Sequence, residues 1–131
     1  MYDAVYDNDN LFAKILRGEI PSTALYEDAY AYAFPDINAQ APVHALVIPK
    51  GPYVDMSDLT ANGSDAEVLG FTRAVGHVAR DVLGLAETGY RLLVNNGPDS
   101  NQEVPHLHVH IIGGRNLGPV LSRLNDRGGQ P

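Results

Sequence analysis

The decisive segment of this sequence is Pro105-His-Leu-His-Val-His-Ile-Ile112, in which polar and apolar side chains alternate. Side chains two residues apart on a β-strand point to the same face and lie roughly 6.5–7 Å apart. We therefore expect a strand over residues 107–112, with His106, His108 and His110 together on one face. The intervening apolar side chains would point to the hydrophobic core on the other face.

Other segments also have the composition of strands. The nearly continuous apolar run at residues 43–48 predicts a central strand, and residues 90–95 predict a neighbour. Shorter strands are expected at residues 23–26 and 29–34, joined by a turn at Glu27-Asp28. Most connections are shorter than the dozen or so residues that a parallel crossover needs, so the sheet should be antiparallel.

Helix signals lie on either side of these strands. Asn10 can cap a short helix over residues 11–17, which Gly18 would end. Ser64 and Glu67 have the spacing of a capping box and open a long helix over residues 65–83, ended by Gly84. The apolar positions Val68, Phe71, Val75, Val78 and Val82 mark its buried stripe. The predicted fold class is α+β, an antiparallel sheet of about five strands with one long and one short helix.

Composition limits the possible functions. The chain has 131 residues, 44% of them apolar, which fits a single domain over residues 1–131. A formal net charge of −7 argues against nucleic acid as a partner. There are no cysteines, so disulfides and thiolate metal sites are excluded. No apolar run approaches the roughly 20 residues of a membrane span, and we expect a cytoplasmic protein without a membrane partner.

The histidine cluster alone leaves three interpretations open. The cluster could be a solvent-exposed polar face, although strand faces of that kind ordinarily favour Thr, Lys or Glu. It could bind a metal, because imidazole suits zinc, copper and iron. It could also perform phosphoryl chemistry, because a neutral imidazole is a good nucleophile and a neighbouring ring can donate to phosphate oxygens.

Together with other motifs, the cluster resembles the signature of the histidine triad family, His-x-His-x-His followed by two apolar residues. The resemblance covers residues 11–115, leaving residues 116–131 as a C-terminal tail. The further matching motifs, in order, are Phe12-Ala-Lys-Ile-Leu-Arg-Gly-Glu-Ile-Pro21, Tyr26-Glu-Asp28, Phe34-Pro-Asp-Ile-Asn38, Ala41-Pro-Val-His-Ala-Leu-Val-Ile-Pro-Lys50, Asn95-Asn-Gly97, Gln102 and Gly113-Gly114-Arg115.

The branch that the sequence resembles most is that of the histidine triad nucleotide-binding proteins, typically purine nucleoside phosphoramidases. This resemblance implies a HIT-like fold and a homodimer whose two sheets join into one. It implies hydrolysis of purine nucleoside 5′-phosphoramidates through a nucleotidyl-histidine intermediate, with AMP or GMP as product. It implies no cofactor and no catalytic metal.

The resemblance also assigns roles to individual residues. His108 would be the nucleophile, with its other ring nitrogen held by a backbone carbonyl. His110 would contact the phosphate oxygens and assist the leaving group, while His106 and His44 would form a second layer of hydrogen bonds that moves protons.

The remaining assignments concern nucleotide binding. Asn95 and Gln102 would contact the phosphate, and Asp36 would accept hydrogen bonds from the ribose hydroxyls. A flat apolar slot would hold the purine base. Its expected walls are Leu11, Phe12, Ile15, Phe34 and Ile37.

The sequence departs from the family pattern at Glu103, where a Ser or Thr is frequent, and it lacks the usual C-terminal tryptophan and the cysteines of a structural zinc site. A carboxylate beside a phosphate would repel it, which leaves the leaving-group preference open. The alternative functions are a dinucleoside polyphosphate hydrolase, a nucleotide-binding or scaffold protein with weak catalysis, and a metal-dependent enzyme.

Overall fold

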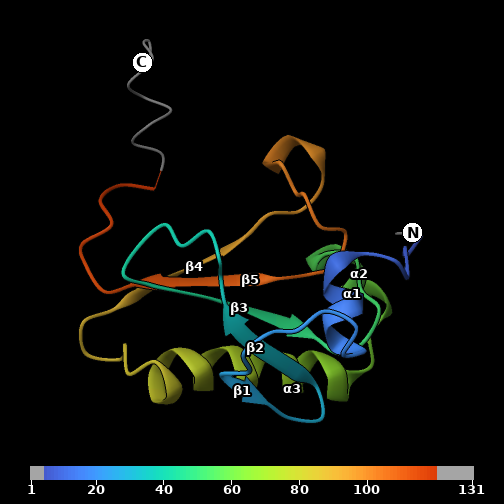
Figure 1. Cartoon of the computed structure of the whole chain (residues 1–131), viewed down its shortest axis with the longest axis horizontal. Helices are drawn as coiled ribbons and strands as arrows, with labels where there is room; N and C mark the ends of the chain where they lie inside the picture. Colours follow the sequence, from blue (N-terminus) through green and yellow to red (C-terminus); the bar gives the residue numbers. More distant parts are fainter. Residues whose placement is uncertain (1–4, 121–131) are drawn as a thin grey trace.

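The computed structural model describes residues 5–120. These residues form a five-stranded antiparallel sheet in the order β1-β2-β3-β5-β4 (Figure 1). The strands are β1 (Tyr26–Glu27), β2 (Ala31–Pro35), β3 (Val43–Pro49), β4 (Tyr90–Val94) and β5 (Val109–Gly113). The helices are α1 (Leu11–Leu16), α2 (Met56–Asn62) and α3 (Asp65–His77), together with the short turns η1 (Val78–Val82) and η2 (Pro98–Ser100). The α+β class and the antiparallel sheet are thus confirmed.

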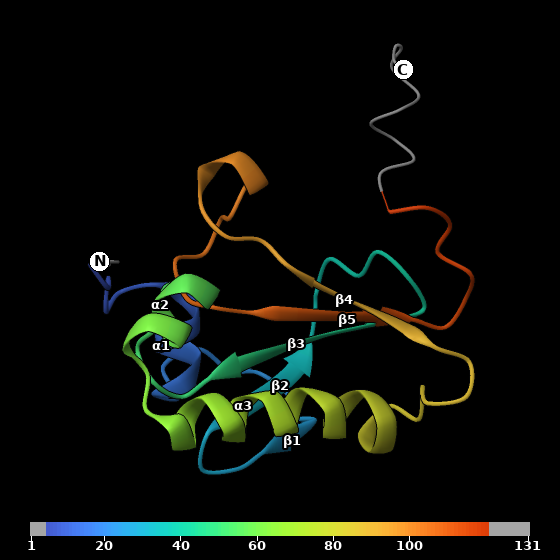
Figure 2. The same cartoon turned by 180° about the vertical axis from the view of Figure 1, so that it is seen from behind.

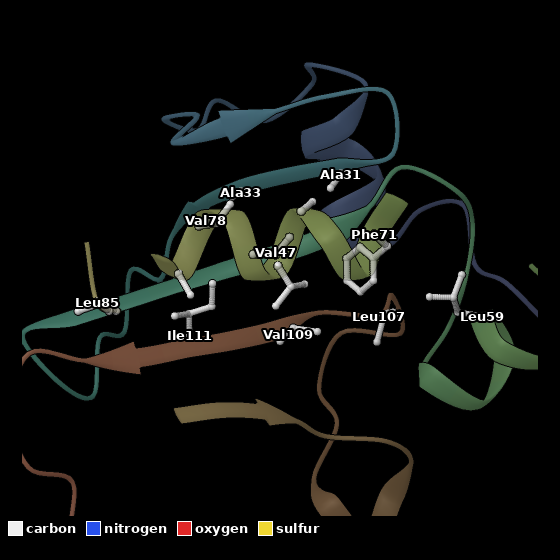
Figure 3. Close-up of a cluster of buried hydrophobic side chains, with 13 residues drawn as sticks. Ala31, Ala33, Val47, Leu59, Phe71, Val78, Leu85, Leu107, Val109 and Ile111 are labelled. Atoms are coloured by element: carbon white, nitrogen blue, oxygen red, sulfur yellow. The ribbon is translucent and has the colours of Figure 1, made fainter. Parts of the chain in front are cut away.

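The long helix α3 covers one face of the sheet, as the front and back views agree (Figure 2). Phe71 from α3 and Val78 from η1 contribute side chains to the buried cluster there, and alternate strand residues meet them from the sheet (Figure 3). Those strand residues are Ala31, Ala33, Val47, Val109 and Ile111. Because paired residues share a face, this set defines the α3 face of the sheet.

The opposite face carries the bulkier alternate residues and packs against α1. Phe12 from α1 meets Phe34 from β2 edge to face, with ring centroids 5.6 Å apart. Leu46 and Ile48 from β3 complete this second cluster. Asn10 caps α1 as predicted, because its side-chain oxygen accepts the backbone N–H of Ala13.

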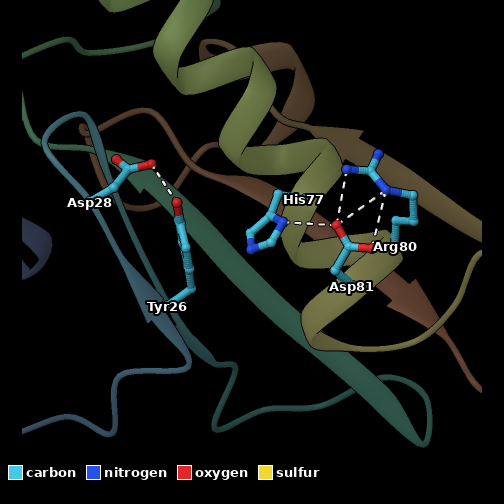
Figure 4. Close-up of polar contacts among 5 residues, drawn as sticks. All are labelled: Tyr26, Asp28, His77, Arg80 and Asp81. Carbon is cyan, nitrogen blue, oxygen red and sulfur yellow. Dashed lines mark hydrogen bonds and ion pairs between the residues drawn. The ribbon is translucent and has the colours of Figure 1, made fainter.

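The end of the long helix differs from the prediction. The capping box of Ser64 and Glu67 is present, but α-helix ends at His77 and continues as the π-helical turn η1. A π turn has one more residue than an α turn, so it shifts the buried stripe by one position. Val78 is buried as predicted, but Val82 is 38% exposed, and Leu83, one position later, packs against the core in its place. On the outer surface, His77 pairs with Asp81 across this junction (Figure 4).

Several predicted boundaries were wrong. The first hairpin turns later than expected, since β1 is only Tyr26–Glu27 and the Asp28 side chain accepts the N–H groups of Tyr30 and Ala31. Strand β5 begins at Val109, two residues after its predicted start. Helix α2 was not predicted, although Asp55 caps it by accepting the Asp58 N–H.

Within residues 5–120, no helix has the length and apolar character needed to cross a membrane.

Two glycines of α3 provide a test of this packing. A Cβ added at Gly70 would lie 2.2 Å from Cδ2 of Tyr30, whereas at Gly76 the nearest atom outside the local backbone is Nη1 of Arg80 at 3.8 Å. Alanine favours a helix over glycine by about 0.5–1 kcal/mol. We expect Gly76→Ala to raise the free energy of unfolding by that amount and Gly70→Ala to lower it, as measured by urea denaturation. Equal stabilisation by both substitutions would contradict the described contact.

Candidate functional site

The first two histidines of the cluster precede the hydrogen-bonded part of β5. Their backbone is held by single contacts: His106 N–H donates to the Val104 carbonyl and Leu107 N–H donates to the Tyr53 carbonyl, both at 2.8 Å. Alternation nevertheless continues through this stretch, because Leu107 belongs to the cluster under α3. His106, His108 and His110 lie on the opposite side, where Phe12 contacts the first two rings edge to face.

The His108 ring is fixed in one tautomer. Its Nδ1 lies 2.7 Å from the carbonyl oxygen of His106, an atom that can only accept. Nδ1 therefore carries the proton, and in the neutral ring Nε2 carries the lone pair. The edge contact with Phe12, at a centroid distance of 4.9 Å, holds the ring plane. His108 thus has an available nucleophilic nitrogen.

The tautomer of His110 follows from a chain of hydrogen bonds. The backbone N–H of Gln40 donates to Nδ1 of His44 at 2.9 Å, so this nitrogen has no proton. The proton of His44 is then on Nε2, which lies 2.9 Å from Nδ1 of His110. The neutral His110 ring consequently carries its proton on Nε2. Among the described residues this buried Nε2 has no hydrogen-bond partner, which leaves an N–H donor available.

His106 is completely buried and its ring is anchored at both nitrogens. Nε2 lies 2.9 Å from the carbonyl oxygen of Pro49 at the end of β3, and Nδ1 lies 2.6 Å from the hydroxyl of Tyr6. The predicted second layer of hydrogen bonds around His106 and His44 is divided between two separate sets of partners. His44 joins His110, whereas His106 is tied to the N-terminal segment and to β3.

Burial keeps the three histidines of the cluster neutral. Desolvation lowers the pKa of His106 to about 4, against the opposing hydrogen bond to Pro49. Desolvation, helped by the nearby His108 and His44, lowers the pKa of His110 to about 4. Desolvation also lowers the pKa of His108, although Asp36 and Glu103 act in the other direction.

His108 and His110 line a cavity of about 850 Å³ between α1, the ends of β2 and β4, and the loop before β5. Most of the residues predicted for the site line this cavity. They are His44, His108, His110, Asp36, Asn95, Leu11, Phe12, Ile15, Phe34 and Ile37. Glu103 also lines it, so two carboxylates face the cavity. None of the lining residues within 5–120 is Lys or Arg.

Gln102 and His106 are absent from the cavity wall. The Gln102 side chain accepts from Gly97 N–H at 2.8 Å and donates to the carbonyls of Val54 and Val104 at 2.7 and 3.1 Å. Its polar atoms are thus engaged with backbone groups. In this structure Gln102 orders the loop before β5 rather than presenting its amide to the cavity.

Asp36 lies beside the histidine pair. Its Oδ1 accepts the backbone N–H of Asn38, and its Oδ2 is 3.3 Å from Nε2 of His44 and 3.8 Å from Nδ1 of His110. Potential ligand atoms of these three side chains lie within 4.8 Å of one another, so they could also hold a divalent metal ion. Without a metal, Nε2 of His44 and Nδ1 of His110 are joined by their own hydrogen bond.

Two contributors to the site were missed in the sequence. Gln40 acts through its backbone N–H, which no side-chain pattern reveals. Tyr6 lies outside every matched motif. Its position shortly before the first helix was the only feature that could have indicated a role. The other cavity residues that were not predicted are Ile20, Pro21, Ser22, Thr23, Pro35, Asn38, Leu46, Asn101 and Val104.

Comparisons with known proteins agree with this geometry. The HIT domain matches residues 17–117. An uncharacterised 13.2 kDa HIT-like protein of Azospirillum brasilense is 58% identical over 118 residues, covering 90% of this chain and 96% of the relative. The purine nucleoside phosphoramidase of Escherichia coli is 42% identical over 114 residues, covering 87% and 94%.

A solved structure, a HIT family hydrolase from Clostridium thermocellum, superposes with a TM-score of 0.75 at 44% identity. The match covers 85% of this chain and 95% of that protein. The sheet, the histidine cluster and the extent of these matches together establish that the chain belongs to the HIT domain family.

Proposed function

We propose that this protein hydrolyses purine nucleoside 5′-phosphoramidates, or related nucleotidyl substrates, through a nucleotidyl-histidine intermediate at His108. The observation that carries the proposal is the pairing of two neutral rings with complementary nitrogens. His108 offers a lone pair and His110 offers an N–H, with ring centroids 5.2 Å apart at the wall of one cavity. The name of the Escherichia coli relative supports the substrate class.

In the first step, Nε2 of His108 attacks the phosphorus atom and the P–N bond to the leaving amine breaks. The Nδ1–H bond to the His106 carbonyl stabilises the positive charge that develops on the attacking ring. The leaving nitrogen takes up one proton from solvent as the bond breaks and departs as the neutral amine. Nε2–H of His110 donates a hydrogen bond to a phosphate oxygen, while its Nδ1 accepts from His44.

In the second step, water attacks phosphorus from the cavity. The P–N bond to His108 breaks, the ring recovers its lone pair, and the proton lost by the attacking water returns to solvent. The products are a nucleoside monophosphate and a free amine. The proton taken up in the first step is thus released in the second.

The remainder of the cavity would hold the nucleoside. We assign the base to the apolar wall made by Leu11, Phe12, Ile15, Phe34 and Ile37, and the ribose hydroxyls to Asp36. The Ile37 side chain is 95% exposed, and a bound purine ring would bury part of this apolar surface. Asn95 would donate to the phosphate, and Gln102 would contribute only by ordering its loop.

The central prediction concerns His108→Ala. We expect turnover of an adenosine phosphoramidate to fall by about 10³-fold or more, because no other lone pair can replace the nucleophile. Release of AMP measures the rate, and His77→Ala provides a histidine control with unchanged turnover, because His77 packs against Tyr26 and does not line the cavity. Wild-type activity in His108→Ala would exclude the mechanism.

The same assay separates the alternatives. Faster turnover of diadenosine polyphosphates than of phosphoramidates would identify a dinucleoside polyphosphate hydrolase. AMP binding without turnover of either substrate would identify a nucleotide-binding or scaffold protein. Loss of activity after chelation, with recovery on adding zinc, would identify a metal site at Asp36, His44 and His110.

Neutral buried histidines also predict how stability depends on pH. The pKa values of His106 and His110 are about 4 in the folded protein against 6.5 in the unfolded chain. Between these values the unfolded state binds more protons, so the free energy of unfolding falls as pH falls. From pH 7 to pH 5 we expect a loss of about 2 kcal/mol from His106 and a smaller loss from His110, whose ring faces the open cavity and is screened by solvent.

Urea denaturation at several pH values measures this loss. His110→Asn should reduce the loss between pH 7 and pH 5, because one of the three groups with a lowered pKa is absent. A wild-type stability that stays constant down to pH 5 would show that the rings are not buried as neutral groups.

We further propose a homodimer that extends the sheet through β4. This strand is an edge of the sheet, whereas the other edge, β1, has only two residues. Tyr90 and Leu92 on β4 are 41% and 47% exposed. We expect light scattering to give a dimer, and Leu92→Glu to give a monomer, because a carboxylate at the pairing edge would have to be buried. Leu69→Glu on α3 is the matched control, and a wild-type monomer would contradict the proposal.

A further inference from the structure

We propose that Tyr6 is a positioning residue for the nucleophile, which it holds in place through the ring of His106. The inference rests on the proposed function and extends it to a side chain outside the cavity. Tyr6 does not line the cavity, and it belongs to the segment that precedes α1. Its hydroxyl nevertheless reaches Nδ1 of His106 at 2.6 Å, 100 positions away in the chain.

The direction of this hydrogen bond can be assigned. The Pro49 carbonyl can only accept, so Nε2 of His106 carries the proton. In a neutral ring Nδ1 then has the lone pair, and the Tyr6 hydroxyl must be the donor. Burial supports both protonation states, because it raises the pKa of Tyr6 and lowers that of His106 to about 4. Tyr6 and Pro49 together fix one tautomer and one orientation of the His106 ring.

The same residue supplies the carbonyl that orients the nucleophile. His106 O accepts Nδ1–H of His108 at 2.7 Å, so displacement of the His106 backbone would displace the acceptor. This backbone lies before β5, which begins at Val109, and the peptide group that carries the carbonyl is held by the Leu107 N–H bond to the Tyr53 carbonyl at 2.8 Å. The anchored His106 ring adds a second constraint on the same residue. The path of contacts runs from the Tyr6 hydroxyl to the His106 ring, its carbonyl and the His108 ring.

Removal of the Tyr6 hydroxyl has a definite consequence. In Tyr6→Phe the aromatic ring can keep its edge contact with His106, at a centroid distance of 5.6 Å in the wild type. Nδ1 of His106 would lose its donor and become a buried, unsatisfied acceptor. The ring would then be anchored at Pro49 alone, and the carbonyl that faces His108 would become less well fixed.

The experiment compares Tyr6→Phe with the wild type in the phosphoramidate assay. We expect kcat to fall by about tenfold, because misplacement of a reacting group by a fraction of an ångström has effects of this size. We expect KM to stay within about twofold, because neither Tyr6 nor His106 lines the cavity. The matched control is Tyr26→Phe. The Tyr26 hydroxyl donates to Asp28 at 2.8 Å (Figure 4), and neither residue lines the cavity.

A double-mutant cycle tests whether Tyr6 acts through His106. In a His106→Gln background, Tyr6→Phe should cause no further fall in kcat, since the ring that it positions is gone. Nitrogen NMR of the histidine rings gives a readout that does not require turnover. We expect the Nδ1–H proton of His108 to exchange with water faster in Tyr6→Phe than in the wild type or in Tyr26→Phe.

These outcomes separate the two proposals. If wild-type protein does not turn over the substrate, the proposed function fails, and the exchange rate of the His108 proton still decides the role of Tyr6. Unchanged kcat and unchanged exchange in Tyr6→Phe would overturn the inference. So would an equal fall in kcat for Tyr6→Phe and Tyr26→Phe, because that result would reflect lost stability alone.

Discussion

The hydrogen bond from Nδ1–H of His108 to the carbonyl of His106 is the constraint on which the rest of the site depends. It decides which nitrogen of His108 is protonated and leaves the other as a lone pair. Both partners of the bond lie before the first paired residue of β5, in a stretch that the sheet itself does not hold. The contacts of His106 with Pro49 and Tyr6 therefore matter as much for the nucleophile as the strand that follows it.

The carboxylates near the histidine cluster would be expected to favour the charged form of its imidazole rings. Asp36 and Glu103 face the cavity, and nearby carboxylates ordinarily raise the pKa of an imidazole. Desolvation is nevertheless the largest influence on each ring of the cluster, and the pKa of each is lowered. His108 and His110 thus keep the lone pair and the N–H that the chemistry requires, even in a chain with a net charge of −7.

Much of this organisation could be predicted from the sequence because it depends on alternation. The period of two in residues 105–112 placed the three histidines on one side and Leu107 under α3, although β5 itself begins later than predicted. Alternation could not reveal which partners each ring would find. The His106 ring is hydrogen-bonded to Tyr6 and Pro49. The His44 ring, on the neighbouring strand, is hydrogen-bonded to Gln40 and His110.

The remaining differences from the prediction have similar physical causes. Backbone groups such as the Gln40 N–H and the Pro49 carbonyl carry no side-chain signature, so their role becomes visible only in three dimensions. Gln102 fits the family motif, but backbone groups around the loop before β5 use its polar atoms. The π turn after α3 shifts the buried stripe without any Gly or Pro at the point of the change. In each case a tertiary contact, rather than local preference, decides the outcome.

The absence of Lys and Arg from the cavity wall within residues 5–120 has a consequence for phosphate recognition. A phosphate that enters the proposed site would meet neutral N–H groups rather than a fixed positive charge, and the buried Nε2–H of His110 has no partner among the described residues. Because an anion favours the protonated form of a nearby imidazole, a bound phosphate would raise the pKa of His110 above its value in the free protein. The carboxylate of Asp36, 3.8 Å from Nδ1 of the same ring, acts in the same direction. Substrate binding and the protonation of His110 would therefore be coupled: the ring is neutral while the cavity is empty, and a bound phosphate would increase the fraction of rings that carry a second proton.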